Sequence, residues 1–131
     1  MRGDAEIRKG WINDELSGRI IQSIIKVHRL LGPGFVECIY KNALIIELKR
    51  AGLGIETEKD LIIRYEGHVV GCHRADLIVE GARMVELKAV EELNSTHYAR
   101  LRSYLRAAGL QVGILVNFAK VVADFRRIEV S

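Results

Sequence analysis

The segment RADLIVEGARMVELKAV, residues 74–90, decides the fold of this chain. Its two halves have the composition of apolar β-strands, and Glu80-Gly81 between them predicts a turn, so the segment predicts a β-hairpin. Three charged residues interrupt the apolar runs: Asp76, Glu86 and Lys88. Their position in the best sheet-forming segment of the chain needs a physical explanation.

The geometry of a hairpin predicts which of these side chains meet. If the turn is centred on Gly81, Asp76 and Glu86 lie directly opposite each other, with their Cβ atoms about 5 Å apart. Lys88 lies two residues beyond Glu86, so its side chain projects from the same face. A two-residue turn would shift this pairing by one, so the prediction requires an odd-numbered loop or a bulge.

Two carboxylates that face each other in a half-buried sheet repel each other unless a cation lies between them. Carboxylate oxygens suit a hard cation such as Mg²⁺ or Mn²⁺, which keeps several waters and accepts phosphate oxygens. Such an ion lowers the pKa of a bound water, and Lys88 would hold the attacking water or neutralise transition-state charge. An ordinary cross-strand salt-bridge cluster on an exposed sheet face is the alternative explanation.

Hydrophobic periodicity and turn residues predict the elements around this hairpin. Asn13 is the expected N-cap of the first helix. The predicted helices cover residues 13–31, 36–51 and 94–109, and the predicted strands outside the hairpin cover 55–59, 61–65, 112–118 and 125–130. The order is two helices, four strands, a helix and two strands. The sequence therefore predicts an α/β chain with a mixed (α+β) central sheet that is flanked by helices.

Length and composition favour one domain over residues 1–131, with residues 1–12 as an N-terminal extension. No apolar run reaches 18 residues and the N-terminus is charged, so we expect no membrane contact and a cytoplasmic location. Cys38 and Cys72 lie far apart, which excludes a structural zinc site and predicts reduced core thiols. The net charge of +3 is compatible with a nucleic-acid partner.

The spacing of Asp76, Glu86 and Lys88 forms the pattern D-x(n)-E-x-K, which resembles the PD-(D/E)XK nuclease superfamily. Within it, the chain is most similar to the GxxExxY proteins, whose name motif stands here as GFVECIY, residues 34–40. In this segment the motif residues are Gly34, Glu37 and Tyr40. The RADL and VELKAV stretches, at 74–77 and 85–90, resemble two further segments of the same proteins.

The resemblance implies a restriction-endonuclease-like core and a site that binds Mg²⁺ or Mn²⁺. It implies that Asp76, Glu86 and the backbone carbonyl of Leu87 are metal ligands. It also implies that Lys88 is the catalytic lysine and that Glu37, from the helix before the sheet, reaches the same site as a catalytic residue and a further metal ligand. From composition alone, Glu37 equally suits a helix N-terminus.

The resemblance also suggests substrate-binding residues on the third predicted helix. Relatives often carry H-x-x-Q-x-x-x-Y there, and this chain has His97, Arg100 and Tyr104, with arginine in the position of the glutamine. These three residues share one helical stripe, which faces either the substrate or solvent. His73 and Arg74 precede Asp76 and are expected to border the site, or Arg74 simply pairs with an acid. Tyr40 either contacts the substrate or packs with a hydrogen-bonded hydroxyl.

Two functions follow as hypotheses. The first is a metal-dependent nuclease that hydrolyses phosphodiester bonds in nucleic acid; DNA is the first candidate substrate, and the sequence does not decide between DNA and RNA. The second is a catalytically weak or inactive nucleic-acid-binding or interaction module with the same fold, which the replacement by Arg100 favours. A homodimer is expected if both strands of a duplex are cut at once. The sequence leaves open endo versus exo cleavage, strand and sequence preference, and the pathway.

Overall fold

The structure, a computed structural model, describes residues 14–131. The expected extension over residues 1–12 and the expected cap Asn13 lie outside this range. The elements are α2 (Glu15–Leu31), α3 (Glu37–Arg50), β1 (Ile55–Tyr65), β2 (His68–Val79), β3 (Arg83–Lys88), α4 (Ser95–Ala108), β4 (Val112–Asn117) and β5 (Asp124–Glu129). No helix within the described range is both long and apolar enough to cross a membrane.

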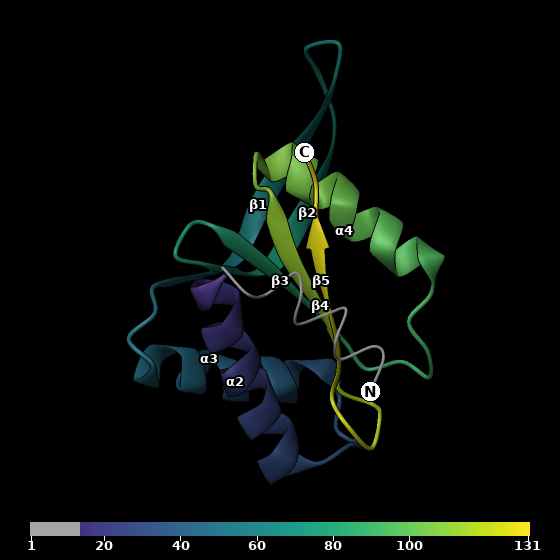
Figure 1. The fold of residues 1–131 in the computed structure, drawn as a ribbon. Coiled ribbons are helices and arrows are strands. Elements are labelled where there is room, and N and C mark those ends of the chain that lie inside the picture. Colours follow the sequence, from purple (N-terminus) through teal and green to yellow (C-terminus); the bar gives the residue numbers. More distant parts are fainter. Residues whose placement is uncertain (1–13) are drawn as a thin grey trace.

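The strands form one five-stranded sheet in the order β1-β2-β3-β4-β5. The pair β3 and β4 is parallel, because α4 carries the chain back between them, and the other pairs are antiparallel. Figure 1 shows the sheet with its helices. The mixed sheet flanked by helices is therefore confirmed.

Two apolar clusters fill the two faces of this sheet. Leu44 and Leu48 of α3 pack in the first cluster, together with residues of α2. Leu101 and Leu105 of α4 pack in the second cluster on the opposite face. Every residue of β4 is buried, as the apolar run at 112–118 predicts for a strand that is covered on both faces.

β1 is one continuous strand, so the prediction of two strands separated at Asp60 is wrong. β1 is the terminal strand of the sheet, and its polar residues, Asp60 included, are exposed on its surface. Polar side chains therefore interrupt the apolar pattern without interrupting the backbone pairing. Glu58 takes a left-handed conformation (φ 50°), which is unusual within a strand, but β1 continues through it.

Asp14, and not Asn13, is the N-cap of α2. Its carboxylate accepts a hydrogen bond from the Ser17 N–H at 3.0 Å and contacts the guanidinium groups of Arg83 and Arg127, both at 2.9 Å. Burial alone would raise the pKa of Asp14, but the hydrogen bonds from Arg83, Ser17 and Arg127 hold this pKa well below its usual range. This buried ion cluster fixes the start of α2 against β3 and β5.

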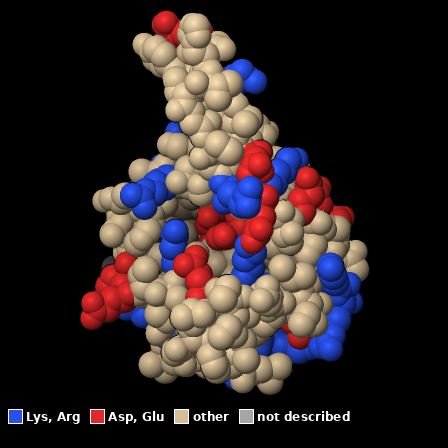
Figure 2. All heavy atoms as spheres, turned by 180° about the vertical axis from the view of Figure 1, so that it is seen from behind, with Lys and Arg blue, Asp and Glu red and all other residues tan. Residues whose placement is uncertain are grey.

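The ends of β1 and β2 project beyond the helices as a two-stranded hairpin arm, residues 62–72 (Figures 1 and 2). Four large apolar side chains on the arm are exposed: Ile62, Tyr65, Val69 and Val70.

Cys72 is on the arm, and Cys38 lies off the buried stripe of α3. Both thiols are free and exposed, so the prediction that they lie in the core is wrong.

Candidate active site

The hairpin of β2 and β3 has the register that the sequence predicts. Leu77 lies opposite Val85 and Val79 opposite Arg83, so the turn is centred on Gly81 and the loop has three residues. Gly81 has a φ of 62°, a left-handed conformation that glycine adopts at little cost. The positions that follow Leu77 and Val85 along this register are Asp76 and Glu86.

At Asp76 and Glu86 the two strands separate. The paired residues end at Leu77 and Val85, while β3 continues its parallel pairing with β4. Side-chain carboxylates take over the hydrogen bonds of the backbone: Asp76 Oδ2 accepts from the Leu87 N–H at 3.0 Å, and Glu86 Oε1 lies 3.4 Å from the Asp76 nitrogen. The opening between the strands thus brings two carboxyl groups together at the centre of the sheet.

The alternation of side chains along β2 slips at Asp76. Ala75 packs in the α4 cluster, whereas Leu77, two residues later, packs in the cluster of α2 and α3. In the ladder of β1 and β2 the residues on both sides of this point are paired, but Glu58 and Asp76 are not paired with each other. Asp76 therefore lies between the two faces of the sheet, and the expectation that it shares one face with Glu86 and Lys88 is incomplete.

The two carboxyl groups crowd each other electrostatically. Glu86 is only 5% exposed. This burial, together with the negative charge of Asp76, raises the pKa of Glu86 to about 8. In the metal-free protein Glu86 therefore holds a proton at neutral pH, and a cation beside Asp76 would displace that proton.

Glu37 joins this pair from the first turn of α3, where the sequence predicts the helix to begin. Protein atoms packed around its carboxyl group, and to a smaller extent the negative charge of Asp76, raise the pKa of Glu37. The positive charges of Lys88 and Lys41 act in the opposite direction. Glu37 thus lies within electrostatic reach of Asp76 and Lys88, although these residues are distant in sequence.

Tyr40 supports the segment that leads to Glu37. Its hydroxyl donates to the Gly32 carbonyl at 2.6 Å and accepts from the Phe35 N–H at 3.2 Å, and its ring stacks on Phe118. Tyr40 has no exposed surface. This burial favours the packing alternative for Tyr40, and its contact with a substrate stays a prediction.

The substrate-facing stripe expected on α4 lies beside the carboxylates. A small cavity is lined by residues of both: His73, Glu86, Lys88, His97, Arg100 and Tyr104. Arg100 is exposed, and it forms no ion pair with Glu86 or any other acid of the described chain. His97 also closes the start of α4, because its Nδ1 accepts from the Asn94 N–H at 3.0 Å.

One residue near the site was missed among the candidates from sequence. Lys41 Nζ lies 3.1 Å from Glu58 Oε1 and 4.0 Å from Asp76 Oδ1, and its position one helical turn after Glu37 was the available signal. His73, which the sequence places at the border of the site, stacks on Tyr104 with ring centroids 3.5 Å apart, and its Nε2 lies 3.4 Å from Glu86 Oε1. The contact with Tyr104 depends on how α4 packs, so no local pattern predicts it.

Arg74 pairs with an acid. Its Nε lies 3.1 Å from Asp60 Oδ1, across the ladder of β1 and β2, and both side chains are exposed. Figure 2 shows acidic and basic side chains gathered around a hollow at the base of the hairpin arm. The structure gives the Arg74 guanidinium an acidic partner on the neighbouring strand.

The oxygen atoms beside Asp76 and Glu86 are the candidate ligands for a divalent cation. Within residues 14–131, no three His, Cys, Asp or Glu side chains converge into a metal cluster. The candidate ligands are the two adjacent carboxyl groups of Asp76 and Glu86 and the Leu87 carbonyl. Mg²⁺ is typically held by one or two carboxylates and keeps several waters, so this oxygen-only set fits such an ion.

Comparison with known proteins gives one finding. Residues 14–128 match a family model described as the PD-(D/E)XK nuclease superfamily, and this range contains every residue of the candidate site. No similar protein was found among curated proteins or among solved structures. The resemblance to the superfamily is confirmed by this match, and the narrower resemblance to the GxxExxY proteins stays a prediction.

Proposed function

Because the match covers nearly all of its residues, the chain belongs to the PD-(D/E)XK nuclease superfamily, and we propose that it is a divalent-metal-dependent nuclease. It would hydrolyse phosphodiester bonds in nucleic acid, and DNA is the first candidate substrate. One observation carries the proposal: the sheet opens at Asp76 and Glu86 and leaves two crowded carboxyl groups beside Lys88. An ordinary salt-bridge cluster does not explain a buried acid with a raised pKa.

PD-(D/E)XK nucleases generally use divalent metal ions. Here Asp76, Glu86 and the Leu87 carbonyl would hold Mg²⁺ or Mn²⁺, with Glu37 as a further ligand. The bound ion would lower the pKa of a water and stabilise charge on a phosphoryl oxygen. Relief of the repulsion between Asp76 and Glu86 would contribute to the affinity of this site for the ion.

Lys88 and Glu37 are the remaining catalytic candidates. Lys88 lines the cavity beside Glu86, and its Nζ would donate hydrogen bonds to a phosphate oxygen or to the attacking water. The Glu37 carboxylate would accept a hydrogen bond from that water and orient it. Both roles need the geometry that Tyr40 provides, since it fixes the loop before Glu37.

Substrate contacts are proposed for the cavity wall on α4. His97, Arg100 and Tyr104 line the cavity with Glu86 and Lys88, which supports contact with the strand that is cut. Arg74 would contact a phosphate only after leaving Asp60, so its contribution is expected to be the smallest.

We also assign the chain to the GxxExxY proteins within the superfamily. The support is the position of the motif residues: Gly34 lies in the turn before α3, Glu37 begins the helix, and Tyr40 anchors both. The predicted cytoplasmic location, the single domain over the whole chain and the homodimer have no further support from the site.

A binding module without turnover is the second candidate, and Arg100 favours it. This arginine brings a fixed positive charge to the cavity of Glu86 and Lys88, where relatives often carry glutamine. A positive charge there would strengthen phosphate binding and weaken binding of a metal ion. The two functions differ in whether bound nucleic acid is cut.

Cleavage of fluorescent single- and double-stranded DNA and RNA, with Mg²⁺, Mn²⁺ or a chelator, tests the proposal. We expect metal-dependent cleavage that Asp76→Asn and Lys88→Ala abolish, while the exposed control Glu91→Gln keeps it. Binding of the same oligonucleotides without cleavage under any metal condition would support the binding module. Cleavage that persists in both site variants would refute the assigned site.

A further inference from the structure

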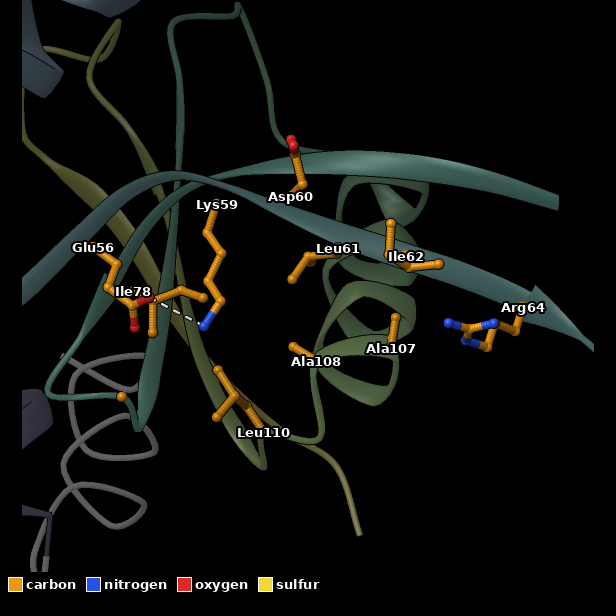
Figure 3. A pocket seen from close by; sticks show the side chains of 11 residues that line it. Glu56, Lys59, Asp60, Leu61, Ile62, Arg64, Ile78, Ala107, Ala108 and Leu110 are labelled. Carbon is orange, nitrogen blue, oxygen red and sulfur yellow. Dashed lines mark ion pairs between the residues drawn. The ribbon is translucent and has the colours of Figure 1, made fainter. Parts of the chain in front are cut away.

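β1 leaves one edge of the sheet open. It is the terminal strand, and within residues 14–131 no backbone hydrogen bond joins the outer edge of β1 to another segment. A groove of about 400 Å³ lies between β1, from Glu56 to Arg64, and the end of α4, and Ile78 and Gly81 also line it. Figure 3 shows β1 on one side of the groove and Ala107, Ala108 and Leu110 on the other.

The chemistry of this edge favours a protein strand over nucleic acid. Three acids, Glu56, Glu58 and Asp60, outnumber the two cations Lys59 and Arg64 along β1, so phosphates would meet net negative charge. The hairpin arm next to the groove exposes large apolar side chains, which a partner would cover. An exposed edge with an adjacent groove is the geometry at which an extended strand adds to a sheet.

We propose that the occupant is β1 of a second copy of this chain, paired antiparallel about a two-fold axis at Ile62. The regular part of the strand, between the left-handed Glu58 and the end of β1, covers residues 59–65 and is centred on Ile62. The irregularity near Ile63 and Arg64 leaves this edge intact, because the extra residue is on β2. A two-fold axis makes the contact isologous, so one strand supplies both halves.

The charges along β1 are complementary in this register. Arg64 of one copy lies opposite Asp60 of the other, and this pair occurs twice. Arg64 has no acidic partner within the described chain, so the second copy supplies one. Residues 60, 62 and 64 project from one face of β1, so both members of each Asp60–Arg64 pair lie on the same face of the joined sheet. Charge complementarity therefore supports the Ile62-centred register.

The pairing covers the regular part of β1. In the register centred on Ile62, residues 59–65 of the two copies pair over a length of about 24 Å, at roughly 3.4 Å per residue. A specific interface needs about 800 Å² per copy, roughly a tenth of the 7802 Å² surface of this chain. A contact 24 Å long reaches that area only with a width of about 33 Å, so a stable dimer would also cover the exposed apolar side chains of the hairpin arm.

The mass of the full chain in solution is the first test. We expect light scattering to give twice 14.8 kDa at about 100 µM protein. Arg64→Glu places an acid opposite Asp60 and should shift the dissociation constant upward by about tenfold, while Arg64→Lys should keep the dimer. A monomeric mass for the wild-type chain at this concentration would overturn the proposal and leave the groove to another occupant.

A cross-link at the axis is the second test, and it identifies the surface. In a Cys38→Ser, Cys72→Ser background, Ile62→Cys places two thiols opposite each other, with Cα atoms about 5 Å apart, which suits a disulfide. Mild oxidation should give a covalent dimer. Ile46→Cys in the same background is the control, because Ile46 is equally exposed on α3 and lies away from β1. A dimer that fails to cross-link at residue 62 and ignores Arg64→Glu would also overturn the proposal.

Discussion

Replacing Glu86 by glutamine tests the crowding of carboxyl groups from which the proposed metal site is argued. Glutamine has nearly the same shape and keeps an oxygen that accepts the Asp76 N–H, so the fold should survive the change. Only the titration of residue 86 is removed. The prediction is therefore a change in how the free energy of unfolding depends on pH, in protein freed of metal by a chelator.

The sign and size follow from the raised pKa. Burial and the charge of Asp76 raise the pKa of Glu86 from 4.5 to about 8 in the folded protein. The folded state therefore keeps the proton to higher pH than the unfolded state does. Its stabilising effect is fully present below pH 4.5 and is lost as the pH rises through 8. At about 1.36 kcal/mol per pH unit the total is on the order of 5 kcal/mol, and most of it falls between pH 5 and pH 8.

Other groups titrate in this window, so the comparison is made between proteins at each pH. Glu37, with a raised pKa, acts in the same direction as Glu86. Burial lowers the pKa of His73 below 6.5, so its effect has the opposite sign and stability rises as the pH passes through that range. Subtracting Glu86→Gln from the wild type at equal pH cancels contributions that the two proteins share.

Urea unfolding at pH 5, 6.5 and 8 measures the difference. We expect the wild type to lose a few kcal/mol, on the order of 3, relative to Glu86→Gln over this range. Glu91→Gln, at an exposed loop position, is the control and should run parallel to the wild type. Parallel curves for wild type and Glu86→Gln would refute the carboxylate crowding and remove the main support for a metal between these strands.

Three further predictions address the site and the fold. Lys88→Ala should lower the cleavage rate about 100-fold and leave oligonucleotide affinity nearly unchanged, because its charge acts mainly on the transition state. Arg100→Gln should weaken oligonucleotide binding and make its salt dependence shallower by about one phosphate contact, with Mn²⁺ affinity unchanged by calorimetry. Asp14→Asn should cost about 3 kcal/mol in urea unfolding, because it removes the negative charge that Arg83 and Arg127 contact while an asparagine still caps α2.

Each of these predictions has a contrary outcome. Cleavage at the wild-type rate in Lys88→Ala would make that lysine structural, and Lys49→Ala, exposed at the end of α3, is its control. Stronger Mn²⁺ binding in Arg100→Gln would mean that the arginine opposes the ion. If Asp14→Asn lowers the free energy of unfolding by less than about 1 kcal/mol, the cluster contributes no more than weak surface ion pairs do.

The sequence by itself determined most of the secondary structure and the central register. Apolar periodicity gave the three described helices, because an amphipathic face must repeat every three to four residues to be buried. The three-residue loop centred on Gly81 set Asp76 opposite Glu86, since strand pairing on both sides of a tight turn leaves little freedom. The polar edge strand was the exception, because the exposed charged residues along β1 led to the wrong prediction that the strand ends at Asp60.

The tertiary structure decided the surroundings of that pair. The alternation of side chains between the two faces of the sheet is interrupted at Asp76, where β1, β2 and β3 meet, and no local pattern in β2 predicts this interruption. The burial of Tyr40 depends on Phe118, which is 78 residues away, and the contact of His73 with Tyr104 depends on how α4 crosses the sheet. Short-range patterns determine which elements form, but the environment of a side chain depends on residues distant in sequence, which become neighbours only when those elements pack.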